Sequence, residues 1–303
     1  KTGAKTGLSK DRFYPNHNYE ADTMNIDLRE KRVIVTGASR GIGYAIASAF
    51  AKNGARVAIC ARNETAIKEA GATMEAPSAN IIARSVDVTD TRAVKAFVNE
   101  VAEAWGGVDV LVNNAGQGKG GSLDTLSPED ILEHANVLQM GHFRFVQAVV
   151  PHMRAQRWGR IIEINALAGT IPTPAGIPSV INRASCVALA KSLGMSLPKD
   201  NILVNSLNMG WIDTGQWERH FQEMGPGVTR EEFDEMVLKV VPLGRYGKPE
   251  DVAGMALFLS SDYASFISGA SIDIAGGMGG QIAYFPTLKS DFAKSIQAKR
   301  EKT

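Results

Sequence analysis

The sequence predicts an α/β fold in which one domain is built on a doubly wound parallel sheet. Short apolar runs rich in β-branched residues alternate with segments of helical apolar spacing, from residue 32 to residue 277. Strands that alternate with single helices in this way are typical of parallel sheets covered on both faces. No repeat and no linker interrupts the alternation, so we expect a single domain.

The expected elements follow in order along the chain. The strands are RVIVTG (32–37), ARVAICA (55–61), NIIARSVDV (80–88), VDVLVNNAG (108–116), RIIEINA (160–166), NILVNSL (201–207) and ASIDIAGG (270–277). The helices are 42–54, which ends on Gly54 as a stop signal, 66–74, 91–107, a long one at about 128–154, one from near 179 to 195, and two more near 230 and 250. In AGIPSVINRASCVALAKSL (175–193), Pro178 is a plausible first helical residue.

The ends of the chain have a different composition. Residues 1–23 are polar without an apolar signal core, so we expect an extension or a remnant of expression before a domain at 24–277. Residues 278–303 form a C-terminal tail that ends in the charged segment LKSDFAKSIQAKREKT.

The amino-acid composition limits the kinds of partner that we expect. The net charge is +1, which gives no reason to expect nucleic acid or an anionic membrane. No apolar run approaches the roughly 18–20 residues that span a bilayer. Cys60 and Cys186 are too few for a disulfide framework, so we expect buried thiols in a reducing, cytoplasmic compartment. We expect a small-molecule substrate and no metal.

A glycine-rich segment lies where a nucleotide would bind. VTGASRGIG (35–43) follows the first strand and opens the first helix. Glycines at this place let the backbone turn tightly and approach a pyrophosphate, which then lies at the helix N-terminus. The residues expected to hold the cofactor here are Gly37, Ser39, Arg40, Gly41, Ile42 and Gly43.

The residues after the second strand predict which cofactor binds. An acidic residue there would bind ribose hydroxyls and repel a 2′-phosphate, but the chain has Ala61 and Arg62 instead. Arg40 in the glycine loop adds a second guanidinium, and two such groups suit a phosphate. We therefore expect NADP(H) rather than NAD(H).

Taken together, these motifs resemble the short-chain dehydrogenase/reductase family. The resemblance covers roughly residues 28–277 and rests on Thr36–Gly43, Asp87–Val88, NNAG at Asn113–Gly116, and the run that begins PLGRYGKPEDVAG (242–254). It implies a Rossmann-type fold and a homodimer or homotetramer formed through the helices at 128–154 and 179–195.

The same resemblance assigns further cofactor residues. It implies that Asp87 and Val88 line the adenine pocket, and that Asn113, Ala115 and Gly116 flank the cofactor ribose. In GWIDT (210–214), it places Ile212 and Thr214 near the carboxamide and pyrophosphate.

The catalytic residues of that family do not fit this chain. Its hydride chemistry uses Ser, Tyr and Lys, usually with Asn, and the flanking residues align these places with Ala166, Ser179, Arg183 and Leu138. A shifted alignment would not restore the catalytic residues, because no tyrosine lies between residues 45 and 245 and no lysine between 120 and 190. Arg183 stays protonated but can still bond the cofactor ribose.

Losing a positioned acid typically costs about 10²–10⁴-fold in rate. That loss would cripple ketone reduction, but it matters less for an iminium or an activated C=C acceptor. The candidate catalytic residues are Arg183, Ser179, Asn165 beside the old serine place, and His142, one helical turn after Leu138. Three weaker candidates for the acid are Lys119, His220 and Tyr284.

Three functions remain open on the sequence. The first is an NADP(H)-dependent oxidoreductase with a non-standard active site that transfers hydride to or from a small organic substrate. The second is a non-redox isomerase, lyase or cyclase, in which Arg183, Asn165 and Ser179 bind an anionic or carbonyl substrate. The third is an NADP(H)-binding pseudoenzyme that acts as a sensor or partner subunit.

Overall fold

The computed structural model describes residues 25–174, 176–224, 227–280 and 294. The predicted extension 1–23, most of the tail 278–303 and the candidate Tyr284 lie outside the described residues. The domain boundaries at 24 and 277 therefore stay predictions.

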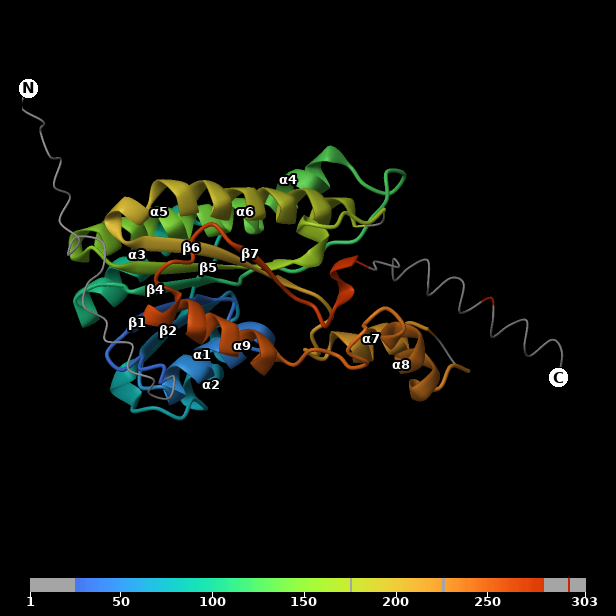
Figure 1. The fold of residues 1–303 in the computed structure, drawn as a ribbon, viewed down its shortest axis with the longest axis horizontal. Coiled ribbons are helices and arrows are strands. Elements are labelled where there is room, and N and C mark those ends of the chain that lie inside the picture. Colours follow the sequence, from blue (N-terminus) through green and yellow to red (C-terminus); the bar gives the residue numbers. More distant parts are fainter. Residues whose placement is uncertain (1–24, 175, 225–226, 281–293, 295–303) are drawn as a thin grey trace, which may run out of the picture.

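One seven-stranded sheet organises the described chain, with every strand pair parallel and the order β3-β2-β1-β4-β5-β6-β7 (Figure 1). The strands are β1 (Arg32–Thr36), β2 (Arg56–Ala61), β3 (Ile81–Ser85), β4 (Val110–Asn113), β5 (Gly159–Ala166), β6 (Ile202–Met209) and β7 (Ser271–Ile274). The strand order reverses between β1 and β4, which makes this edge the switch point where ligands bind in doubly wound sheets. The predicted fold class is confirmed.

Helices cover both faces of the sheet. They are α1 (Gly41–Lys52), α2 (Glu64–Ala72), α3 (Thr91–Trp105), α4 (Pro128–Val137), α5 (Gln139–Gln156), α6 (Ile177–Ser196), α7 (Gln216–Gln222), α8 (Arg230–Leu238) and α9 (Pro249–Leu259). Helices α1, α2 and α9 pack on one face and α3, α5 and α6 on the other, while α7 and α8 stand beside the body (Figure 1). Within the described residues, no helix is long and apolar enough to cross a membrane.

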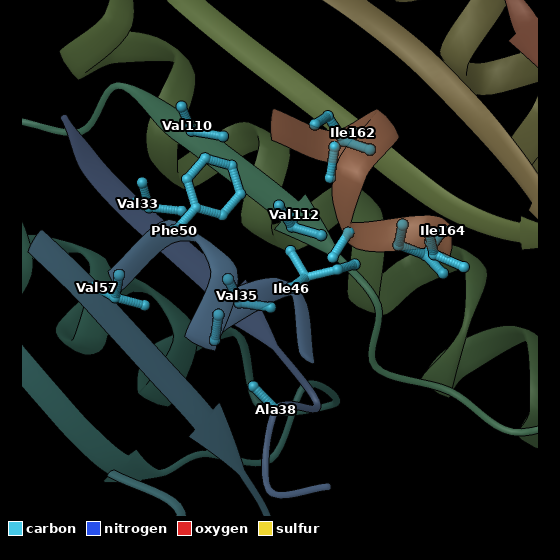
Figure 2. Packing of buried hydrophobic residues seen from close by; sticks show 14 of the residues in the cluster. Val33, Val35, Ala38, Ile46, Phe50, Val57, Val110, Val112, Ile162 and Ile164 are labelled. Atoms are coloured by element: carbon cyan, nitrogen blue, oxygen red, sulfur yellow. The ribbon is translucent and has the colours of Figure 1, made fainter. Parts of the chain in front are cut away.

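The core beneath α1 fixes the start of the glycine loop. Val33 and Val35 of β1 pack with Ile46 and Phe50 of α1, and all four side chains are fully buried (Figure 2). Ala38, inside the loop, belongs to the same cluster. Burying one such apolar side chain is worth about 1.5–3 kcal/mol, so the loop is anchored at a well-packed site.

One predicted helix is two helices in the structure, separated by a single residue. The predicted helix at about 128–154 is divided at one residue, Leu138, which keeps right-handed helical angles (φ −84°, ψ −67°) between α4 and α5. Helix α4 begins with a capping box in which Ser127 and Asp130 bond each other's backbone N–H, with Pro128 in its first turn. Helix α6 begins at Ile177, with Pro178 in its first turn.

Candidate functional site

The glycine loop forms a tight cradle at the end of β1. Gly37 and Gly41 adopt positive φ angles of 65° and 61°, which other residues reach only under strain. A Cβ on Gly43 would lie 2.5 Å from Asn114 Nδ2 and 2.6 Å from the Gly37 carbonyl oxygen, so only glycine fits. Arg40 provides no side-chain cap to α1, and the first turn of α1 has no acidic residue. The helix N-terminus is therefore suited to a pyrophosphate.

Two residues that the sequence argument did not assign hold this cradle in place. The Asn114 amide donates to the carbonyl oxygens of Thr36 and Gly37, each at 3.0 Å. The Thr36 hydroxyl accepts the backbone N–H groups of Asn114 and Ala115, each at 2.9 Å. The glycine loop and the NNAG turn are thus one hydrogen-bonded unit, and the NNAG motif was the signal for it.

The adenosine end of the site carries positive charge. Arg40 and Arg62 are both exposed, at the ends of β1 and β2. The Asp87 carboxylate accepts the N–H and hydroxyl of Thr89, and these bonds, with the nearby guanidinium of Arg62, lower its pKa. Arg144 of α5 donates to the Val88 carbonyl oxygen at 3.2 Å, a contact the sequence did not reveal.

Two residues of GWIDT lie close to helix α1 and the glycine loop. Ile212 is buried in the core that supports α1, and the Thr214 side chain lies 3.4 Å from where a Cβ on Gly41 would stand. Beyond them, the rings of Trp211 and Trp217 pack 5.2 Å apart, and His220 stands 3.3 Å from a carboxylate oxygen of Glu223. The His220 side chain therefore contacts Glu223, the residue that follows the last turn of α7.

Ser179, at the tyrosine place, makes structural contacts. Its hydroxyl accepts the Lys119 N–H at 2.7 Å and donates to the Lys119 carbonyl oxygen at 3.1 Å. The Lys119 ammonium forms ion pairs with Asp130 at 2.8 Å and Glu133 at 3.5 Å, and its bond to Asp130 raises its pKa. Neither Ser179 nor Lys119 holds a proton poised for transfer.

Other contacts fasten the same loop, which runs from residue 117 to residue 121. The ring of His134 in α4 contacts the Gln117 carbonyl oxygen at 2.8 Å and the Asn182 amide at 2.9 Å. The Gly121 carbonyl oxygen accepts the N–H groups of Gly176 and Ile177 at the start of α6. The loop is thus bonded to α4 on one side and to α6 on the other.

The residues that align with the family's catalytic Asn, Ser and Lys are either apolar or bonded to the backbone. Leu138 is fully buried, and its Cδ1 lies 2.7 Å from where a Cβ on Gly116 would stand. The Arg183 side chain lies beneath β5 and donates to the Ile164 carbonyl oxygen at 2.7 Å. Burial lowers the pKa of Arg183 from its ordinary value. Ala166, at the serine place, offers no polar group.

Asn165 belongs to a series of hydrogen-bonded polar side chains on β5, β6 and β7, of which all but the exposed Asp273 are buried. Its amide donates to the Ser206 hydroxyl at 2.9 Å, and Ser206 donates to Asn208 at 2.9 Å. Asn208 in turn donates to Asp273 of β7 at 2.7 Å. The buried Oδ1 of Asn165 has no partner among the described residues. In this series of side chains, it is the atom that a ligand or a water molecule would satisfy.

His142 is fully buried and paired with a residue that the sequence did not single out. Its Nδ1 lies 2.5 Å from Glu163 Oε2, and its Nε2 lies 3.2 Å from the Ala115 carbonyl oxygen. The other oxygen of Glu163 accepts the Asn113 amide at 2.9 Å. The candidates His142, Asn113 and Ala115 are therefore brought together, and Asn113 Oδ1 is buried without a partner among the described residues.

The comparisons agree on one family. Residues 37–279 match the family model described as Enoyl-(Acyl carrier protein) reductase. The chain is 34% identical to 3-oxoacyl-(acyl-carrier-protein) reductase FabG of Thermotoga maritima, over 83% of this chain and 98% of that protein. It is 32% identical to the 3alpha-hydroxysteroid dehydrogenase of Mediterraneibacter gnavus, over 82% of this chain and 97% of that one.

A solved structure extends the likeness to three dimensions. L-Sorbose reductase from Gluconobacter frateurii, complexed with NADPH and L-sorbose, matches with a TM-score of 0.79 at 30% identity, covering 86% of this chain and 100% of that chain. The chain belongs to the short-chain dehydrogenase/reductase family of oxidoreductases, as its motifs predict. The assignment of individual site residues stays a prediction.

Proposed function

We propose that this protein is an NADP(H)-dependent oxidoreductase that transfers hydride to or from a small organic substrate through a non-standard active site. The observation that carries the proposal is the complete glycine cradle, in which a Cβ on Gly43 would lie 2.5 Å from Asn114 Nδ2. Family membership and the NADPH complex of L-sorbose reductase support it.

The residues present fit such a cofactor. The α1 N-terminus would hold the pyrophosphate, Arg40 and Arg62 the 2′-phosphate, and Asp87 and Val88 the adenine. Asn113, whose buried Oδ1 lacks a partner among the described residues, would face the ribose together with Ala115, Gly116 and Arg183. When bound, NADPH supplies the hydride.

The proposed substrate class rests on the four residues that align with the family's catalytic Asn, Ser, Tyr and Lys. Ser179 spends its hydroxyl on Lys119, Arg183 remains a cation, and Ala166 and Leu138 carry no proton. Reduction of a simple ketone needs a proton on the forming alkoxide, which none of these groups delivers. We infer that the substrate is an iminium or an activated C=C bond. Hydride addition to an iminium gives a neutral amine and needs no proton, and the enolate formed from an activated C=C bond takes its proton from solvent. The enoyl reductase description of the matching model supports the second of these.

The pseudoenzyme is the second candidate, and one observation favours it. The Ser179 hydroxyl accepts from the Lys119 N–H and donates to the Lys119 carbonyl oxygen, so the residue at the catalytic tyrosine position has a structural role. A pseudoenzyme would bind NADPH and reduce no substrate. The isomerase, lyase or cyclase alternative has no contact of its own that favours it.

An assay of NADPH consumption, monitored by absorbance, distinguishes the oxidoreductase from the pseudoenzyme. We expect turnover with cyclic imines or conjugated enals and at least about 100-fold less with the matching ketones, because the acid is missing. The variant Ala166→Ser with Ser179→Tyr and Arg183→Lys should gain ketone reduction. No turnover in either protein, with NADPH bound, would favour the pseudoenzyme.

We also propose a homodimer or homotetramer formed through α4, α5 and α6. Leu132 of α4, Met140 of α5 and Ile181 of α6 expose large apolar side chains, and Ile181 is 47% accessible. Apolar side chains gathered on neighbouring helices are typical of a surface covered by another subunit. Sedimentation of wild type beside Ile181→Lys tests this, and loss of the oligomer is the expected result.

A further inference from the structure

A buried ion pair lies directly behind the NNAG turn. His142 on α5 and Glu163 on β5 are both inaccessible to solvent, and Nδ1 of the ring is 2.5 Å from Oε2 of the carboxylate. The Asn113 amide bridges them, because it donates to Glu163 Oε1 at 2.9 Å and to the His142 carbonyl oxygen at 3.2 Å. Three elements, β4, β5 and α5, therefore meet at one polar cluster.

The contacts define the charge of this cluster. The Ala115 carbonyl oxygen only accepts, so Nε2 of His142 donates to it, and with the Glu163 carboxylate as the acceptor of Nδ1–H the ring donates twice, as an imidazolium does. The groups that face it are Glu163 from β5 and the Cys186 thiol from α6. Burial by itself lowers the pKa of His142, but the charge of Glu163 and the contacts with Glu163 and Cys186 together outweigh burial and raise the pKa to about 10.

A buried ion pair is a costly way to fill this space. Removing two charges from water costs several kcal/mol per ion, and well-packed apolar residues often serve stability as well, so stability alone does not explain the pair. What an apolar pair could not supply is the N–H of Nε2 at the Ala115 carbonyl oxygen. That carbonyl belongs to the turn that faces the cofactor ribose in the proposed function.

We propose that His142 is a positioning residue for the cofactor: its Nε2–H holds the Ala115 carbonyl, and Glu163 is the counterion that keeps the ring doubly protonated. This inference rests on the proposed binding of NADP(H). His142 touches neither cofactor nor substrate and acts through the backbone of the NNAG turn.

Substitution of His142 by Gln or by Asn can test its two ring hydrogen bonds separately. In a Gln side chain the amide nitrogen stands near the place of Nε2, and in an Asn side chain near that of Nδ1. Glu163→Gln supplies a neutral background, in which the Gln can donate to Nδ1 of a neutral ring while Nε2–H still reaches Ala115. His142→Gln in that background keeps the bond to Ala115, whereas His142→Asn keeps only the bond to residue 163.

The measurement is the Kd for NADPH of wild type, Glu163→Gln and the two double variants, each with a thermal melt. We expect His142→Gln to bind within about twofold of its background and His142→Asn about tenfold more weakly, since one lost hydrogen bond is worth about 1.4 kcal/mol. Equal Kd values for two variants that melt cooperatively would overturn the proposal, because a merely structural role lowers the melting temperature without separating Asn from Gln.

A measurement on wild type covers the case in which a variant does not fold. The ¹⁵N resonances of His142 should show both ring nitrogens protonated at pH 7, and the Nε2 resonance should shift when NADPH is added. A ring that is neutral, or whose Nε2 ignores bound NADPH, would contradict the inference while leaving the proposed function in place. Failure of wild type to bind NADPH would overturn both.

Discussion

We predict that the stability supplied by the His142–Glu163 pair decreases as pH rises from about 6.5 towards 10. The pKa of His142 is 6.5 without its surroundings and about 10 in the folded protein. A raised folded pKa means that the stabilisation is complete below 6.5 and is lost as pH climbs through the folded value. The perturbation is therefore pH itself, applied to wild type and to a variant with no titrating pair.

The magnitude follows from linkage. One proton bound in the folded state and released in the unfolded state gives a slope of about 1.4 kcal/mol per pH unit. Across the window set by the two pKa values of His142, this amounts to at most about 5 kcal/mol. Removing one partner of a buried ion pair typically costs a similar amount, about 3–5 kcal/mol.

The assay compares melting temperatures of wild type and of His142→Gln with Glu163→Gln between pH 7 and 10. At about 2 °C per kcal/mol for a chain of this size, wild type should lose about 3 °C per pH unit relative to the double variant. Groups elsewhere titrate in both proteins and cancel. A difference that stays constant over this range would show that His142 is uncharged in the folded protein and would refute the argument.

Three further predictions concern the cofactor half and the loop. Gly43→Ala should abolish NADPH binding in a titration because its Cβ has no room. By contrast, Gly254→Ala, at an exposed position of α9 where a Cβ meets nothing within 4 Å, should raise the free energy of unfolding by about 0.5–1 kcal/mol. Arg40→Ala and Arg62→Ala should each weaken NADPH binding about 10- to 100-fold and leave NADH almost unchanged, since only the phosphate contact is lost; equal losses would contradict the assignment. Ser179→Ala should lower the free energy of unfolding by about 1–2 kcal/mol and speed hydrogen exchange in residues 117–121, without the 100-fold fall in turnover that a catalytic acid would show.

The sequence predicted the fold well where local pattern and packing agree. Each buried strand of a parallel sheet is apolar on both faces, so the seven runs were visible, and the glycine loop marked the join of β1 and α1. The break at Leu138 was not visible because helical apolar spacing continues across it. Leu138 itself keeps right-handed helical angles, and its carbonyl oxygen still accepts the His142 N–H at 3.1 Å.

The sequence predicted the glycine loop of the site, whose backbone would bind the cofactor. It did not predict which side chains pair with one another. Motif glycines carry their requirement locally, because positive φ angles and close approach exclude other residues. The partner of His142 is Glu163, 21 residues away on another element, and Ser179 bonds Lys119 across 60 residues. No spacing rule links such residues, so only the packed sheet and helices could show that two candidate catalytic groups make structural contacts.

The most direct test of the central claim is a titration of the wild-type protein with NADPH and with NADH. Trp211 and Trp217, packed together beside Ile212, provide the fluorescence signal. The account predicts saturable NADPH binding at least about tenfold tighter than NADH binding, from the phosphate contacts of Arg40 and Arg62. A folded sample that binds neither nucleotide, or binds both equally well, would contradict it.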